Sequence, residues 1–217
     1  EEMDNEGGIM NAFTSRGSTG YYVRMLSSRI EKGIELLSDM FLNSTFTEEN
    51  LERERNVIIE EIRMYDDIPE EVIHDENIRF ALTGVQSNSI AGTVESVKGI
   101  NREIFLNYYN EQYKASNMVI AVAGKIDQDY IMELLEKGFG AIKDKKTNRK
   151  IDNSYKINSG ENRIKRDTNQ VHLCFNTKGI GSVDENRYAA SINSSALGGN
   201  LRSRPFQKIT EEKALAY

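Results

Sequence analysis

The spacing of apolar residues predicts a succession of helices interrupted by a few short strands. Residues 8–26 alternate in polarity on both sides of a turn that contains glycine, which predicts a β-hairpin. Amphipathic helices are predicted by a roughly 3.6-residue spacing over the ranges 29–43, 47–65, 70–82, 101–113, 127–139 and 188–197. The uninterrupted apolar run 118–123 predicts a buried strand, and residues 171–175 are predicted to form another strand. This order favours an α+β fold, with helices layered on a mostly antiparallel sheet.

The composition of residues 143–168 differs from that of the chain on either side. Lys, Asp, Asn, Ser and Gly replace most apolar residues there, which indicates a linker or an exposed hairpin over residues 146–168. This segment would separate a larger part, residues 1–145, from a second part, residues 169–217. Because the periodic stretch 206–216 runs almost to the last residue, we expect the chain to be a piece of a longer protein.

Charge and cysteine content exclude several classes of function. The 217 residues carry 34 acidic and 28 basic side chains, and this acidic excess argues against binding to nucleic acid. No apolar run is long enough to span a membrane, and no signal-peptide pattern is present, so we expect a cytoplasmic location. Cys174 is the single cysteine, which excludes an intramolecular disulfide and a thiolate pair for a metal. We expect His74 to lie on the surface and His172 and Cys174 to be packed side chains.

Two acidic residues lie within the apolar stripe of the helix predicted at 47–65. At about 100° per residue, Glu54 and Glu61 point in nearly the same direction as Ile58 and are two turns apart. A buried carboxylate is costly unless it is paired, hydrogen-bonded or bound to a metal. One hypothesis is therefore a metal ligand with a supporting carboxylate. The alternative is a Glu–Arg pair with a neighbouring arginine, or a partly exposed helix edge.

Several motifs resemble the pitrilysin family of zinc peptidases. The first is Gly-Gly-Ile-Met-Asn-Ala-Phe-Thr-Ser at 7–15, followed by a Tyr-Tyr pair at 21–22 and by Glu-Arg-Asn-Val-Ile-Ile-Glu-Glu-Ile at 54–62. Further matches are Tyr-Lys-Ala-Ser-Asn-Met at 113–118 and Gly-Gly-Asn at 198–200. Within the family, the chain is most similar to the branch of mitochondrial processing peptidase and its bacterial processing-protease relatives.

The resemblance implies a zinc-dependent endopeptidase built from repeated α+β halves. Residues 1–145 would be the remainder of the zinc-binding half, and residues 169–217 the start of a second half. Glu61 matches the distant Glu that binds zinc, and Glu54 matches the acid that supports the site without ligating. The His-x-x-Glu-His motif, which carries the other ligands and the general base, is absent and is expected upstream. We therefore expect this chain alone to be inactive.

The resemblance also implies a mode of peptide binding. The strand predicted at 8–14 matches an edge strand that pairs with an extended substrate by β-addition. Asn11, Ala12, Phe13 and Thr14 are the candidates for contact with the peptide. The alternative is an ordinary hairpin strand with Phe13 in the core.

The second part departs from the family pattern. Tyr217 matches a tyrosine that contacts the substrate carbonyl, but Thr210 stands in place of its partner arginine. Pro205 replaces the usual leucine, and Ala214 the usual glycine. Loss of a charged donor weakens transition-state stabilisation, so a non-catalytic peptide-binding partner subunit is a second hypothesis, and an autonomous binding module is a third. For partners, we expect an extended peptide and either a homodimer or a paired subunit, but no nucleic acid and no membrane.

Overall fold

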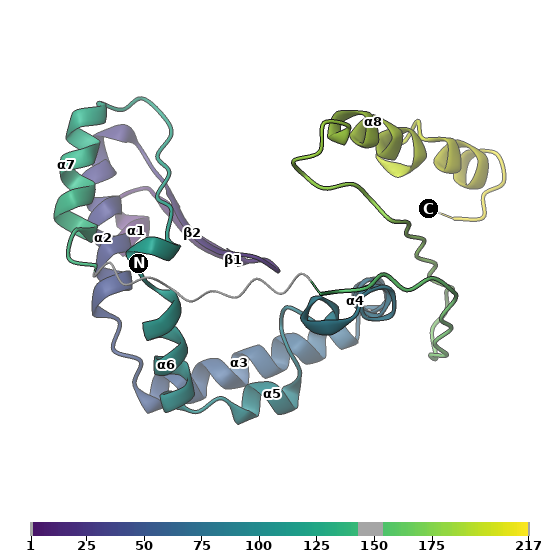
Figure 1. Cartoon of the computed structure of the whole chain (residues 1–217), viewed down its shortest axis with the longest axis horizontal. Coiled ribbons are helices and arrows are strands. Elements are labelled where there is room, and N and C mark those ends of the chain that lie inside the picture. Colours follow the sequence, from purple (N-terminus) through teal and green to yellow (C-terminus); the bar gives the residue numbers. More distant parts are fainter. Residues whose placement is uncertain (1, 143–153, 217) are drawn as a thin grey trace. The chain divides into compact units, whose positions relative to one another are not determined.

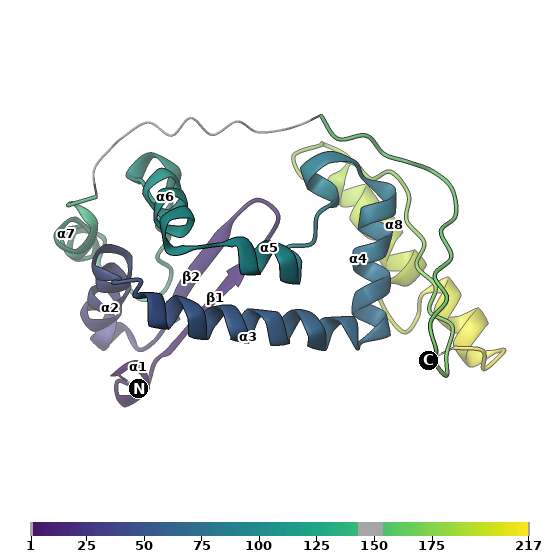
Figure 2. The same cartoon turned by 90° about the horizontal axis from the view of Figure 1, so that it is seen from below.

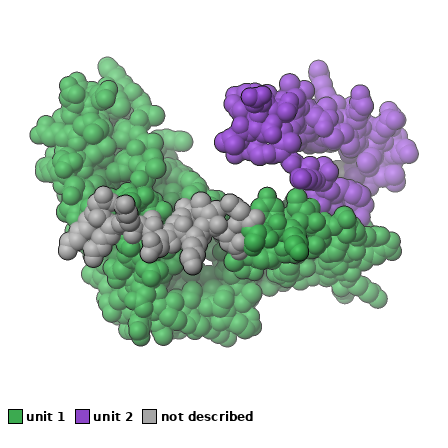
Figure 3. Space-filling model, viewed as in Figure 1, with its two compact units in different colours: residues 1–172 green, residues 173–217 purple. Residues whose placement is uncertain are grey.

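The computed structural model describes residues 2–142 and 154–216 and divides the chain between residues 172 and 173 (Figure 3). The first unit is Glu1–His172 and the second is Leu173–Tyr217. Of the linker expected at 146–168, residues up to 153 lie outside the described residues. Residues 154–168 are exposed, and an antiparallel bridge pairs Ile157 with Leu82.

The first unit contains a β-hairpin and seven of the α-helices in the described part of the chain (Figure 1). Strand β1 (Ile9–Thr14) pairs antiparallel with β2 (Thr19–Arg24), so that Phe13 lies opposite Gly20. The helices are α1 (Glu2–Asn5), α2 (Ile30–Asn43), α3 (Glu48–Asp66), α4 (Pro69–Ala81), α5 (Val94–Gly99), α6 (Arg102–Gln112) and α7 (Gln128–Phe139). The hairpin and the longer helices confirm the elements predicted from apolar spacing, and the fold is α+β.

Side-chain caps explain where several of these helices begin. Thr47, Asn101 and Asp127 each accept a hydrogen bond from a backbone N–H in the first turn of α3, α6 and α7, at 3.3, 2.9 and 2.9 Å. Helix α5, which apolar spacing did not predict, begins with a capping box formed by Thr93 and Ser96. The helix starts are therefore encoded locally, even for a helix of six residues.

Two small hydrophobic clusters hold the helices of the first unit together. One joins α2 to α7 and the other joins α3 to α5, the helix pairs that lie side by side in Figure 2. The buried residues are Ile34, Ile131 and Leu134 in the first cluster and Ile59, Ile62 and Val97 in the second. The second cluster decides which face of α3 is turned away from solvent.

An aromatic cluster connects the hairpin to the helices. The Tyr21 and Tyr113 hydroxyls are 2.9 Å apart, and the Tyr21 ring meets the edge of Phe41 with centroids 5.1 Å apart. Tyr109 donates a hydrogen bond to the Phe41 carbonyl and stacks on Tyr113. Burial, together with the hydrogen bond to Tyr21, raises the pKa of the Tyr113 phenol well above its ordinary value.

This shift predicts a loss of stability at alkaline pH. Because the folded state keeps the Tyr113 proton that the unfolded chain releases above about pH 10, the contribution is complete below that pH and declines above it. Between about pH 9 and about pH 11, wild type should lose about 1 kcal/mol more unfolding free energy than Tyr113→Phe. Urea unfolding at both pH values measures this, with the exposed Tyr108→Phe as control. Equal losses in wild type and Tyr113→Phe would contradict it.

The two segments predicted as strands between the hairpin and the end of the chain do not form strands. Residues 118–123 and 171–175 pair with no strand in the described part of the chain, and Val119 is 94% exposed. A β-ladder needs a neighbouring backbone that exchanges hydrogen bonds with it, and the described residues offer none to these segments. No residue of either segment is fully buried, although Met118, Val122 and Cys174 are half-buried and Val122 packs against the α2–α7 cluster.

No helix in the described ranges combines the length and the apolar character that are required to cross a lipid bilayer.

Candidate functional site

Glu54 and Glu61 lie on one exposed face of α3. Seven residues at about 100° each bring them to within about 20° of one another around the helix axis, two turns apart. Both side chains are exposed, so the expectation that they lie inside the apolar stripe is wrong. The buried side of α3 is centred on Ile59 and Ile62, which pack against α5. Glu61 stands about 100° away from Ile62 around the helix, which places its carboxylate in solvent.

The neighbouring arginines do not pair with these two acids. Arg53 donates to Asn50 and Arg55 donates to Glu52, each one turn away on α3. Arg55 also donates to a backbone carbonyl at the end of α5, at 2.8 Å. Of the alternatives left open by the sequence, an exposed helix edge therefore describes this face, and a buried Glu–Arg pair does not.

The hydroxyl of Tyr65 donates a hydrogen bond to Oε1 of Glu61 at 3.2 Å. Because this bond favours the protonated phenol and the carboxylate repels its anion, the pKa of Tyr65 is raised. Tyr65 is four residues after Glu61, the spacing at which side chains on a helix meet. The Glu61 carboxylate is thus exposed but already oriented by one donor.

The described residues do not form a zinc site by themselves. A catalytic zinc normally takes three protein ligands and a water, whereas no three His, Cys, Asp or Glu side chains in the ranges 2–142 and 154–216 are grouped to hold a metal. His74 is exposed on α4, as expected. His172 is half-buried, with Nδ1 3.7 Å from the Glu70 carboxylate, and Cys174 is half-buried. Glu61 therefore offers one carboxylate and no complete ligand set.

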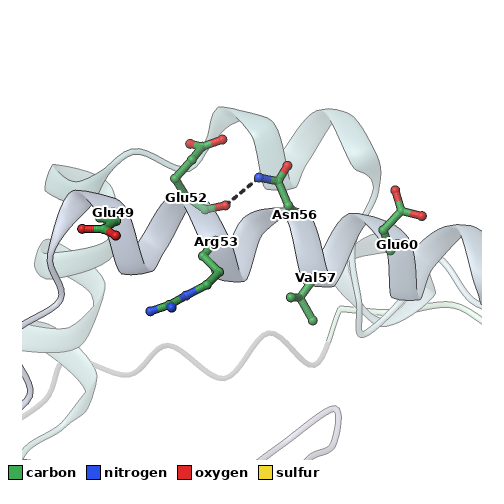
Figure 4. A pocket seen from close by; sticks show the side chains of 6 residues that line it. All are labelled: Glu49, Glu52, Arg53, Asn56, Val57 and Glu60. Atoms are coloured by element: carbon green, nitrogen blue, oxygen red, sulfur yellow. Dashed lines mark hydrogen bonds between the residues drawn. The ribbon is translucent and has the colours of Figure 1, made fainter.

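A shallow hollow runs along a different face of α3 (Figure 4). Its lining residues are Glu49, Glu52, Arg53, Asn56, Val57 and Glu60. Asn56 Nδ2 donates to the Glu52 carbonyl at 3.0 Å across it. Because neither Glu54 nor Glu61 lines the hollow, it is separate from the predicted site.

The outer edge of β1 is open among the described residues, because β2 is its only strand neighbour there. Asn11, Ala12, Phe13 and Thr14 are all exposed. The Asn11 side-chain oxygen accepts the Ala12 N–H at 2.8 Å. Phe13 is 55% exposed and lies over Gly20, where an added Cβ would come within 2.3 Å of its ring. The alternative in which Phe13 belongs to the core is therefore wrong.

The second unit brings together the motif residues of the chain's last part. It contains α8 (Arg187–Gly198) and a π-helical turn, η4 (Phe206–Glu211). A hollow between them is lined by residues that include Asn200, Pro205 and Thr210. Ser203 beneath it is 3% exposed, and its hydroxyl accepts the Phe206 N–H at 3.4 Å. The departures at Pro205 and Thr210 thus face one hollow, whereas Tyr217 lies outside the described residues.

Ala214 adopts a backbone conformation that favours glycine. Its φ is 51°, in the left-handed region. Its N–H bonds to the Thr210 carbonyl at 3.0 Å, and the Leu215 N–H bonds to the Ile209 carbonyl at 2.9 Å, which together close the end of η4. Helices commonly end on a left-handed residue, usually glycine. Alanine at this position therefore carries strain.

We expect Ala214→Gly to stabilise this turn. Relief of left-handed strain, about 1–2 kcal/mol, exceeds the extra backbone entropy of glycine, about 0.5–1 kcal/mol. The gain of about 0.5 kcal/mol should slow hydrogen exchange at the Leu215 amide about twofold. Ala196→Gly, inside α8, is the matched control and should destabilise its helix by about 0.5–1 kcal/mol. Faster exchange at Leu215 in Ala214→Gly would contradict the assignment.

Sequence reasoning missed two residues whose contacts bear on the candidate site. Tyr65 could have been found, because its spacing from Glu61 is that of helix neighbours. Arg16 donates to backbone carbonyls 70 and 72 residues away. No local pattern signals such a contact, because it depends on how distant elements pack.

Both parts of the chain match sequence profiles of one peptidase family. Residues 1–93 match the profile described as Insulinase (Peptidase family M16). Residues 99–217 match the profile described as Peptidase M16 inactive domain.

Curated relatives match over the whole of this chain. It is 36% identical over 219 residues to the uncharacterized zinc protease YmxG of Bacillus subtilis, of which it covers 53%. It is 35% identical over 223 residues to an uncharacterized zinc protease of Mycobacterium leprae, of which it covers 50%. The chain thus spans about half the length of these relatives.

Solved structures share the fold. An M16 inactive domain from Pseudomonas fluorescens matches all of this chain and 53% of its own, with a TM-score of 0.79 at 16% identity. A protease from Helicobacter pylori matches 66% of this chain and 35% of its own, with a TM-score of 0.61 at 21% identity. The profiles confirm the resemblance carried by the motifs, and the chain belongs to peptidase family M16, the insulinase family.

Proposed function

We propose that the whole protein containing this chain is a zinc-dependent endopeptidase that processes or degrades extended peptides in the cytoplasm. The observation that carries the proposal is the pair of exposed acids Glu54 and Glu61, two turns apart on one face of α3. The M16 relatives carry the name of uncharacterized zinc proteases, and these names support the same reaction class.

In this proposal Glu61 is one zinc ligand and Glu54 supports the site without ligating. The remaining ligands come from a His-x-x-Glu-His segment outside these 217 residues. The Tyr65 hydroxyl orients the Glu61 carboxylate by its 3.2 Å hydrogen bond, as partners of metal ligands commonly do. The exposure of Glu54 and Glu61 is compatible with a ligand set completed by another segment.

The open edge of β1 is the proposed acceptor for substrate. Residues Asn11–Thr14 would pair with an extended peptide through the main chain, so that binding depends only loosely on peptide sequence. Phe13, exposed beside this edge, offers an apolar contact for a peptide side chain. In the second unit, Tyr217 is the proposed contact for the substrate carbonyl, and Thr210 offers a neutral hydroxyl in place of an arginine.

The test is a comparison of the whole gene product with the 217-residue chain. Zinc content after exhaustive dialysis and cleavage of an unfolded polypeptide, reduced and carboxymethylated lactalbumin, are measured for both. We expect the whole protein to retain zinc and to cleave the polypeptide until a chelator removes the metal. We expect the 217-residue chain to retain no zinc and to cleave nothing. A whole protein without zinc and without cleavage would refute the proposal.

A non-catalytic peptide-binding subunit is the second candidate. It is favoured by Thr210 in place of a charged donor, by the strained Ala214, and by the inactive-domain profile over residues 99–217. Such a protein would bind the lactalbumin probe without cleaving it, and cleavage would require a second, different subunit. Turnover by the purified whole protein alone, as a monomer or homodimer, would exclude this candidate.

A further inference from the structure

The two ends of the β1–β2 hairpin are supported differently. At the base, Gly8 packs against Met3 of α1, and Gly33 of α2 packs against Met25 and Val23. The strands then run away from these helices towards the turn at residues 15–18 (Figure 1). Because an isolated two-stranded ribbon is only marginally stable, the turn end needs a support of its own to keep β1 fixed.

The turn itself is closed by a pair of serines. The Ser15 N–H bonds to the Ser18 carbonyl at 2.8 Å, and the Ser18 N–H bonds to Ser15 Oγ at 3.2 Å. The Ser15 hydroxyl also lies 3.0 Å from the Ser18 carbonyl oxygen. These bonds fix the backbone on both sides of Arg16, so that its side chain starts from a defined position.

Arg16 connects this turn to a distant part of the first unit. Its Nη1 donates to the carbonyl of Gln86 at 2.7 Å and to the carbonyl of Asn88 at 2.6 Å. Both acceptors belong to the connection between α4 and α5, which includes the short helix η2 (Gly84–Ser87). Hydrogen bonds from a charged donor are stronger than those between neutral groups. Here one guanidinium donates two such bonds.

The connection that accepts these bonds is itself well held. The Ser87 hydroxyl donates to the Gly84 carbonyl at 2.8 Å, and the Asn88 N–H bonds to the Val85 carbonyl at 3.3 Å. Helix α5, which follows, packs its Val97 against α3 in the second hydrophobic cluster. Arg16 therefore joins the proposed peptide-binding strand to the structure that carries the two acids of α3.

We propose that Arg16 is a positioning residue for peptide binding, whose two hydrogen bonds hold the open edge of β1 in place for an extended peptide. This inference rests on the proposed function of β1 as the peptide acceptor. Arg16 does not touch the peptide. Its effect is to reduce the motion of the hairpin that a bound peptide would otherwise have to arrest.

The test measures hairpin order and peptide affinity in the 217-residue chain. Arg16→Gln removes the positive charge and shortens the side chain that carries the donor. Arg16→Lys keeps a positive charge and several N–H donors. Arg24→Gln is the matched control, because it removes the same charge from the exposed opposite end of the hairpin. Hydrogen exchange measures the exchange rates of the backbone amides in β1 and β2. Fluorescence anisotropy measures the affinity for labelled, carboxymethylated lactalbumin.

We expect Arg16→Gln to speed hairpin exchange and to weaken peptide binding, each about tenfold, with partial recovery in Arg16→Lys and no change in Arg24→Gln. Faster exchange with unchanged affinity would overturn the positioning role. Unchanged exchange would overturn the support itself. If wild type binds no peptide, the proposed acceptor fails and the positioning role fails with it, whereas the exchange rates still show whether Arg16 holds the hairpin.

Discussion

Replacing Glu61 with glutamine is expected to remove both bound zinc and peptide cleavage from the whole protein. The amide keeps the size of the side chain but loses the negative charge that a zinc ligand supplies. Changes in groups that merely support ligands cost about 10- to 100-fold in metal affinity, so loss of a ligand should cost more than about 100-fold. Zinc content after dialysis and the initial rate of cleavage are the two measurements.

Two neighbouring substitutions make this result specific. Glu60→Gln changes an exposed acid that pairs with Arg63 on another face of α3, and it should leave zinc and cleavage unchanged. Glu54→Gln should have the intermediate effect of a supporting group, about 10- to 100-fold. A Glu61→Gln protein that keeps its zinc and its activity would show that this acid is not a ligand.

Replacing Ile131 with alanine is expected to lower the free energy of unfolding of the first unit by about 3 kcal/mol. Ile131 is 4% exposed and lies in the cluster that joins α7 to α2. Its truncation removes buried methyl groups and leaves a cavity that two packed helices cannot fill completely. Urea unfolding followed by circular dichroism in the 217-residue chain measures the change.

The control for this substitution lies on the next residue of the same helix. Met132 is 58% exposed, so Met132→Ala should change stability by no more than about 0.5 kcal/mol. Because both variants place alanine in α7, their difference isolates burial from helix propensity. Equal destabilisation by the two substitutions would show that the α2–α7 cluster is not a stabilising core.

The sequence predicted the elements whose signals are local. The 3.6-residue spacing located α2, α3, α4, α6, α7 and α8, and alternation around a turn located the hairpin. Helix α5 was missed because six residues are too few for a periodicity to emerge, although its capping pair Thr93 and Ser96 is present in the sequence. The runs 118–123 and 171–175 were misassigned because a strand exists only where another backbone pairs with it.

The candidate site shows the same division. Helical geometry alone aligned Glu54 with Glu61, and the same local spacing would have been enough to place Tyr65 beside Glu61, although that contact was not predicted. Whether those acids faced the core or solvent depended on where α5 docks, because Val97 meets Ile59 and Ile62 and so turns the acids outward.

For this protein, the sequence by itself determined the family, through short motifs that can each be read without knowing the fold. It also determined the helix positions and the alignment of the two acids, because these depend on residues close together in the chain. Tertiary structure alone decided the exposure of those acids, the failure of the apolar runs to form strands and the contact of Arg16 with residues 86 and 88. These features depend on contacts between segments far apart in the sequence, and local propensity carries no information about such contacts.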